Sequence, residues 1–168
     1  MNDVKARLTQ DHKELDALLR CLAEDAAAPA DCAPLLSTWS QLETRLLGHM
    51  DAEEQYLLPL IEASHPAEVA RTRREHVRIR QMVYELGVAI ELHAVRQPAI
   101  DALVALLHDH AQREDLILYE LAGERASTLL QHRVANLLRA ALQRALHVSL
   151  GGPGRSVTRA GEERRARP

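Results

Sequence analysis

The segment LGHMDAEEQYLLPL, residues 47–60, places His49 and Glu53 four positions apart in an otherwise apolar stretch. The same pair recurs in LLHDHAQREDLILYEL, residues 106–121, as His110 and Glu114. Residues four positions apart lie about one turn apart on the same face of an α-helix. Each segment therefore predicts a helix that carries a histidine and a glutamate on its apolar face.

The composition indicates a globular, helical protein. Of the 168 residues, 46% are hydrophobic, and there is no Phe and one Trp, so the core should be aliphatic. The formal net charge of −3 gives no reason to expect nucleic acid or a membrane as a partner. No apolar run approaches the ~20 residues that span a bilayer. The N-terminus lacks the apolar core of a signal peptide, so we expect a cytoplasmic protein.

Proline and glycine divide the chain into five segments with helical periodicity. They cover about residues 3–25, 34–64, 66–95, 98–123 and 124–147. Short connections between long helices imply antiparallel neighbours. The predicted fold is all-α: an up-down-up-down four-helix bundle at 1–123, an additional C-terminal helix at 124–148 and a disordered Gly/Arg-rich tail at 149–168.

The additional helix and the two cysteines leave alternatives open. The helix has a broad leucine stripe that either packs on the bundle or pairs with a second chain, so a homodimer through it is one hypothesis. Cys21 and Cys32 are either isolated thiols or, because both flank the same short connection, a redox pair.

A histidine stands near the middle of each of the four bundle helices, where leucine would be expected: His12, His49, His76 and His110. Burying an unpaired polar group costs roughly 2–7 kcal/mol, and an unpaired carboxylate costs far more. Four imidazoles and two carboxylates in one core therefore predict a bound cation. Imidazole with carboxylate suits iron, manganese or zinc, and two bridging carboxylates suit a pair of ions.

The predicted helix lengths place most of these histidines at the same level along the bundle axis. Fifteen residues separate His12 from the end of its helix near residue 27, and fifteen separate Pro34 from His49. The third connection does not match, because twenty residues lead from His76 to residue 96 but twelve lead from residue 98 to His110. The third helix must overhang by about 12 Å or end early near residues 87–90.

The ordered pattern His12, His49-x-x-x-Glu53, His76, His110-x-x-x-Glu114 resembles the haemerythrin-like family, also called the HHE cation-binding domain, over about residues 3–122. The resemblance implies a non-haem di-iron centre, with two iron ions joined by an oxo or hydroxo bridge. It implies that the four histidines are terminal ligands and that the two glutamates bridge the irons. The same ligands also accept manganese or zinc.

The sequence departs from the oxygen-carrying haemerythrins at two points. Those proteins carry a His-x-x-x-His motif on the third helix. Here the residues four positions before and after His76 are Thr72 and Arg80. Their fourth-helix motif ends in an aspartate five residues after the histidine, whereas Glu114 is four residues after His110. The pattern therefore favours a protein that binds, senses or reacts with oxygen, nitric oxide or peroxide. The alternative is a metal-responsive or iron-handling module that controls a partner interaction, and the sequence leaves open whether the chain is an enzyme.

Several residues near the motif have two interpretations. Tyr56 follows His49 by seven residues and either contacts the cluster, even as a phenolate ligand, or is a core residue; Tyr119 has a weaker claim. Arg80 and Arg73 either tune the cluster or lie on a solvated face. The remaining histidines are expected outside the site: His65, His93, His108, His132 and His147.

Overall fold

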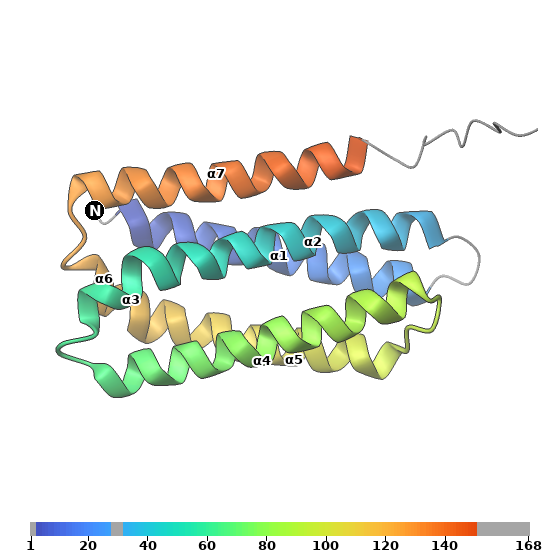
Figure 1. Cartoon of the computed structure of the whole chain (residues 1–168), viewed down its shortest axis with the longest axis horizontal. Helices are drawn as coiled ribbons and strands as arrows, with labels where there is room; N and C mark the ends of the chain where they lie inside the picture. Colours follow the sequence, from blue (N-terminus) through green and yellow to red (C-terminus); the bar gives the residue numbers. More distant parts are fainter. Residues whose placement is uncertain (1–2, 28–31, 151–168) are drawn as a thin grey trace, which may run out of the picture.

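The computed structural model describes residues 3–27 and 32–150, and this part of the chain is helical without any strand, which confirms the all-α prediction. Its long helices are α1 (Asp3–Ala27), α2 (Cys32–Ala52), α4 (Pro66–Glu91), α5 (Gln97–Arg113) and α7 (Thr128–Leu150). Figure 1 shows α1, α2, α4 and α5 side by side, with the chain reversing direction at each connection. None of the described helices has the length and apolar character needed to cross a membrane.

The four helices α1, α2, α4 and α5 enclose a common core. Contacts join α1 to α2, α2 to α4, α4 to α5 and α5 back to α1. Two apolar clusters fill the interior: one includes Leu15, Trp39 and Ile79, and the other includes Leu8, Leu57 and Val69. The site residues lie between the two clusters along each helix, so a polar layer divides the core.

Two short π-helical turns interrupt the helices at the two glutamates. They are η1 (Glu53–Leu57), followed by α3 (Leu58–Ile61), and η2 (Glu114–Leu118), followed by α6 (Tyr119–Gly123). The backbone N–H of Leu58 donates to the carbonyl of Glu53, and that of Tyr119 donates to Glu114, five residues back in each case. One extra residue is thereby inserted into each turn, a feature frequent at functional sites.

The inserted residue changes which side chains are buried after each glutamate. A regular helix would bury Tyr56 and Leu60, but these are half-buried, whereas Leu57, Leu58 and Ile61 are fully buried. After Glu114 the same shift exposes Ile117 and buries its neighbours Leu118, Tyr119 and Ala122. A regular helical period continued past each glutamate would bury Tyr56 and Ile117, so the observed burial is shifted by one residue.

The third helix ends early, which resolves the length mismatch. α4 stops at Glu91 rather than near residue 95. His93 takes a left-handed conformation with φ 53°, and the N–H of Ala94 donates to the carbonyl of Ala89 at 2.8 Å. This geometry is a common way to terminate a helix. The stretches from His76 to Glu91 and from Gln97 to His110 are then similar in length.

The helix α7 packs mainly on α2, beside the four core helices (Figure 1). Gly48 permits the close approach, because a Cβ there would lie 2.4 Å from the Cβ of Ala141. Leu129 and Leu146 remain exposed on α7, and a homodimer through this helix stays a prediction. Residues 151–168 of the predicted tail lie outside the described residues.

Cys21 is exposed and carries a free thiol. The side chain of Cys32 lies outside the described part of the structure. The alternatives of isolated thiols and a redox pair therefore remain as the sequence left them.

Candidate metal centre

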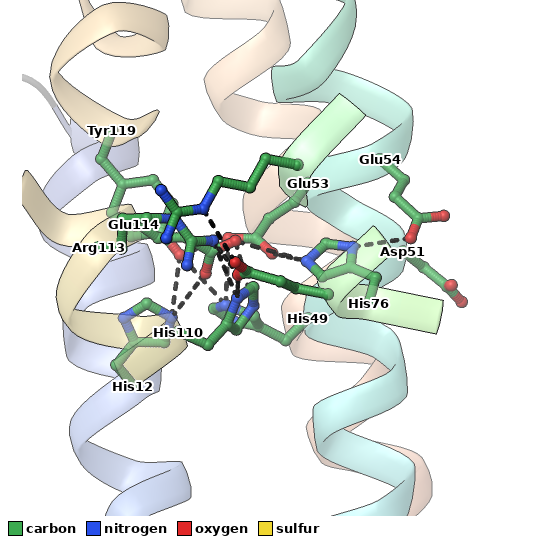
Figure 2. Close-up of polar contacts among 12 residues, drawn as sticks. His12, His49, Asp51, Glu53, Glu54, His76, His110, Arg113, Glu114 and Tyr119 are labelled. Carbon is green, nitrogen blue, oxygen red and sulfur yellow. Dashed lines mark hydrogen bonds and ion pairs between the residues drawn. The ribbon is translucent and has the colours of Figure 1, made fainter. Parts of the chain in front are cut away.

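The six residues predicted to bind metal come together in the polar layer (Figure 2). α1, α2, α4 and α5 each supply one histidine, and the two glutamates begin η1 and η2. Five of the six are buried and His12 is half-buried. Potential ligand atoms within 4.8 Å of one another form two groups: site 1, with His12, His49, Glu53 and Glu114, and site 2, with Glu53, His76, His110 and Glu114.

Both glutamates lie between the two histidine pairs. Glu53 places Oε1 3.3 Å from Nε2 of His49 and Oε2 3.3 Å from Nε2 of His76. Glu114 places Oε2 3.5 Å from Nε2 of His12 and Oε1 3.2 Å from Nε2 of His110. Nε2 of His76 also lies 3.4 Å from Oε1 of Glu114. Every histidine therefore turns Nε2 inward, and each carboxylate faces histidines of both sites.

Each histidine turns its other ring nitrogen, Nδ1, to a carboxylate on a neighbouring helix. Three pairs are hydrogen-bonded: His49–Asp11 at 2.7 Å, His76–Glu54 at 2.7 Å and His110–Glu75 at 3.1 Å. The fourth, His12–Asp115 at 3.3 Å, is an ion-pair contact without a hydrogen bond. Such contacts fix the orientation and tautomer of metal-binding imidazoles. None of these four carboxylates was among the residues predicted from the sequence.

A sequence signal for the outer carboxylates does exist. Each is adjacent in the chain to a site residue: Asp11 to His12, Glu54 to Glu53, Glu75 to His76 and Asp115 to Glu114. Adjacent residues are rotated by about 100° around a helix, so the neighbour of an inward residue points toward the next helix. Consecutive helices run in opposite directions (Figure 1). The residue before a site residue on one helix and the residue after a site residue on the next helix therefore point the same way around the bundle. The four pairs consequently form a closed ring.

Cationic or hydroxyl groups hold the outer carboxylates in turn. Arg45 donates to Asp11 at 2.6 and 2.9 Å and also pairs with Glu14. Arg113 pairs with Glu75, and Thr9 donates to Asp115 at 2.6 Å. These groups hold the outer carboxylates, and the outer carboxylates in turn orient the imidazoles.

Arg80 and Arg73 differ in their relation to the cluster. Arg80 donates to Glu54 at 2.6 Å, and the same oxygen of Glu54 faces His76, so Arg80 acts on the site through one intermediate. Arg73 pairs at 2.6 Å with Glu62 on the surface. Of the two arginines proposed from sequence, only Arg80 belongs to a chain of contacts that reaches a histidine of the site.

The buried carboxylates and imidazoles shift one another's pKa values in the metal-free chain. Burial alone would lower the pKa of His49, but Glu53 and Asp11 raise it to about 10. Burial would likewise lower the pKa of His76, whereas Glu114, Glu53 and Glu54 raise it to about 11. Burial opposes ionisation of Glu53, yet His49 and His76 hold its pKa well below the usual range. Protons on imidazoles therefore supply the positive charge that the carboxylates require.

The residues fit a bound cation. Within the described part of the chain, Oε2 of Glu53, Nε2 of His76 and of His110, and both carboxylate oxygens of Glu114 are buried without a hydrogen bond. Buried polar atoms are nearly always satisfied, so this concentration of unsatisfied donor atoms needs a partner. Imidazole nitrogen and carboxylate oxygen together form a donor set that suits iron, manganese or zinc.

The tyrosine that reaches the cluster is Tyr119 rather than Tyr56. The phenol of Tyr119 is buried, donates to Oε1 of Glu53, and lies 3.1 Å from Nε2 of His12 and 3.2 Å from Nε2 of His49. Burial together with Glu53 and Glu114 raises its pKa. Tyr56 is half-buried and packs against the apolar cluster around Leu57 and Leu58. The π-helical turn explains the difference, because it brings the fifth residue after Glu114 around to the inner face.

Thr72, one turn before His76 on the same face, is fully buried. Its hydroxyl makes no hydrogen bond within the described residues. The five histidines outside the motif are exposed or half-buried, and His108 pairs at the surface with Asp16 at 2.6 Å.

A small cavity of about 50 Å³ lies against the cluster between α1, α2 and α5. Its lining includes the histidines His12, His49 and His110 and the leucines Leu15, Leu46 and Leu107. The space suits a molecule of a few atoms, since one water needs at least about 10–15 Å³.

Comparison with known proteins gives one match. The family model described as Hemerythrin HHE cation binding domain matches residues 3–122. No curated protein and no solved structure matches the chain.

Proposed function

The chain belongs to the haemerythrin HHE cation-binding family, and we propose that it is a non-haem di-iron protein that binds, senses or reacts with oxygen, nitric oxide or peroxide. The observation that carries the proposal is the sharing of Glu53 and Glu114 by both histidine pairs. Two carboxylates shared in this way would bridge two ions. In this proposal the helices α1, α2, α4 and α5 form an up-down-up-down four-helix bundle around the two ions.

The site side chains would have two roles, metal ligation and orientation of the ligands. The Nε2 atoms of the four histidines would bind as terminal ligands, and the outer carboxylates hold each imidazole in the tautomer that leaves Nε2 free to bind. A pair of iron ions, with an oxo or hydroxo bridge, would supply one-electron redox chemistry and a coordination position for a small ligand. Manganese or zinc would fit the same donors.

The small cavity supports a ligand of diatomic size. Leucine side chains form much of its lining, and the histidines of the cluster form one side. An apolar space of this size admits oxygen, nitric oxide or peroxide and excludes larger organic substrates.

The second candidate function is a metal-responsive or iron-handling module that controls a partner interaction without turnover. It is favoured by the unsatisfied polar layer between the two apolar clusters, because metal binding there would stabilise the folded state. The partner could be a second copy of the chain, joined through the exposed leucines of α7.

One experiment separates the two candidates. Reduced, iron-loaded protein is mixed with oxygen, nitric oxide or peroxide in a stopped-flow spectrometer. Rapid spectral change with turnover supports redox reaction at the centre. A change confined to unfolding temperature or oligomeric state supports the regulatory module, and a protein that takes up no iron when iron is supplied would refute the di-iron proposal.

A further inference from the structure

The phenol of Tyr119 lies among the donor atoms of site 1. Its oxygen donates to Oε1 of Glu53 and is 3.1 and 3.2 Å from Nε2 of His12 and His49. Building on the proposed function, we propose that Tyr119 is a fifth protein ligand at site 1, and that site 2 therefore holds the exchangeable coordination position.

The spacing of these atoms matches one coordination sphere. Metal–nitrogen and metal–oxygen bonds of about 2.0–2.2 Å at right angles place neighbouring donors about 3 Å apart. The phenol oxygen has this separation from both imidazole nitrogens of site 1. It therefore lies where a further donor to the same ion would be, beside the nitrogens of His12 and His49.

The local backbone conformation directs the side chain of Tyr119 into the site. The π-helical turn η2 makes Tyr119 the residue directly one turn beyond Glu114, with its N–H bonded to the glutamate carbonyl. Tyr119 is itself a buried member of the apolar cluster that includes Leu8, Leu57 and Val69. Both constraints are present without a metal, so the phenol is preorganised.

Among the residues that the structure describes, none supplies an equivalent donor at site 2. The matching position in η1 and α3, five residues after Glu53 with the same backbone bond, is Leu58. The side chain of Leu58 is fully buried and contains no oxygen or nitrogen. Thr72 adds a buried hydroxyl without a hydrogen bond, one turn from His76. The two sites thus share their glutamates but differ in one protein ligand, which leaves a position at site 2 for a small molecule. His110 of site 2 is among the residues that line the small cavity.

Binding of the phenol requires loss of its proton. As the metal–oxygen bond forms, the O–H bond breaks and the proton passes to solvent. No electron is transferred in this step.

The ligand assignment can be tested on the full chain loaded with ferric iron. The chain has three tyrosines, so Tyr56→Phe with Tyr84→Phe leaves Tyr119 as the single phenol. Tyr56 is half-buried and Tyr84 is exposed, so this double variant should fold. We expect a visible phenolate-to-iron charge-transfer band, with phenolate modes in the resonance Raman spectrum, in both wild type and double variant. Tyr119→Phe should lose the band and keep its iron.

The outcomes distinguish this inference from the proposed function. Absence of the band from an iron-loaded wild type or double variant, or its persistence in Tyr119→Phe, would overturn the assignment of Tyr119. A wild-type chain without bound iron would instead overturn the proposed function. If Tyr119→Phe fails to fold, the double variant still decides the question.

Azide binding tests the location of the exchangeable position. We expect the ferric wild type to bind one azide per chain, at site 2. Tyr119→Phe should bind a second azide, because the position at site 1 is then also open. Equal azide stoichiometry in the two proteins would overturn the assignment of the exchangeable position to site 2.

Discussion

Asp11 on α1 lies 2.7 Å from Nδ1 of His49 on α2, and both side chains are buried. The contact leaves Nε2 of His49 directed at Glu53 and connects the site to Arg45. It is one of four such pairs that run around the helices in one direction. The ring explains how four imidazoles on four helices are held with the same nitrogen inward.

Removal of Asp11 should weaken iron binding without removing a ligand. We expect Asp11→Ala to lower iron affinity by about 10- to 100-fold, because His49 loses the group that fixes its orientation. Competition with a chelator measures the change. Asp16→Ala is the matched control, since Asp16 pairs with the exposed His108. Equal affinities in the two variants would contradict a role for the outer carboxylates.

Glu53→Ala and Glu114→Ala should each abolish iron loading at both sites, because each carboxylate belongs to both ligand groups. His12→Ala and His76→Ala affect one group each, so these variants should retain about half of the iron. Elemental analysis gives the stoichiometry, and circular dichroism reports whether the helices persist. Glu62→Ala on the surface is the control. Full iron content in Glu53→Ala would contradict the bridging assignment.

Gly48→Ala should destabilise the packing of α7. The added methyl would lie 2.4 Å from the Cβ of Ala141, so α2 and α7 must separate. Overpacking of this kind costs about 1–3 kcal/mol of unfolding free energy. The double variant Gly48→Ala with Ala141→Gly restores space and should recover most of the loss in urea unfolding. No rescue would indicate that the contact between these helices does not limit stability.

The metal-free protein should lose stability as the pH rises. The pKa of His49 is about 10 in the folded chain, against an ordinary value of 6.5 when the chain is unfolded, so its proton stabilises the fold fully below pH 6.5. That contribution is lost progressively as the pH increases to about 10. Urea unfolding across this range measures it. The iron-loaded protein should show a weaker dependence, because metal rather than a proton then neutralises the carboxylates, and identical pH profiles would contradict this explanation.

The sequence predicted that these six residues, the four histidines and two glutamates, share one polar layer, because its signal is local and repeated. Histidine at the centre of four apolar helical patterns, with glutamate four positions on in two of them, requires only the helical period. Segment lengths then placed His12 level with His49. The end of α4 could not be chosen from sequence, because apolar residues continue past Glu91 while the actual stop depends on the backbone at His93.

The π-helical turns account for what sequence periodicity missed. A constant helical period extends the seam from Glu53 to Tyr56, whereas one inserted residue moves burial to Leu57 and Leu58. The same insertion after Glu114 brings Tyr119 to the cluster. The signal was present as a one-residue shift of apolar positions, but a regular helix assumed throughout conceals it.

Crystallographic anomalous scattering at the iron edge tests the two-ion centre most directly. Crystals of iron-loaded protein should show two anomalous peaks, one beside His12 and His49 and one beside His76 and His110, with Glu53 and Glu114 between them. A single peak, or none within this layer, would contradict the carboxylate-bridged pair.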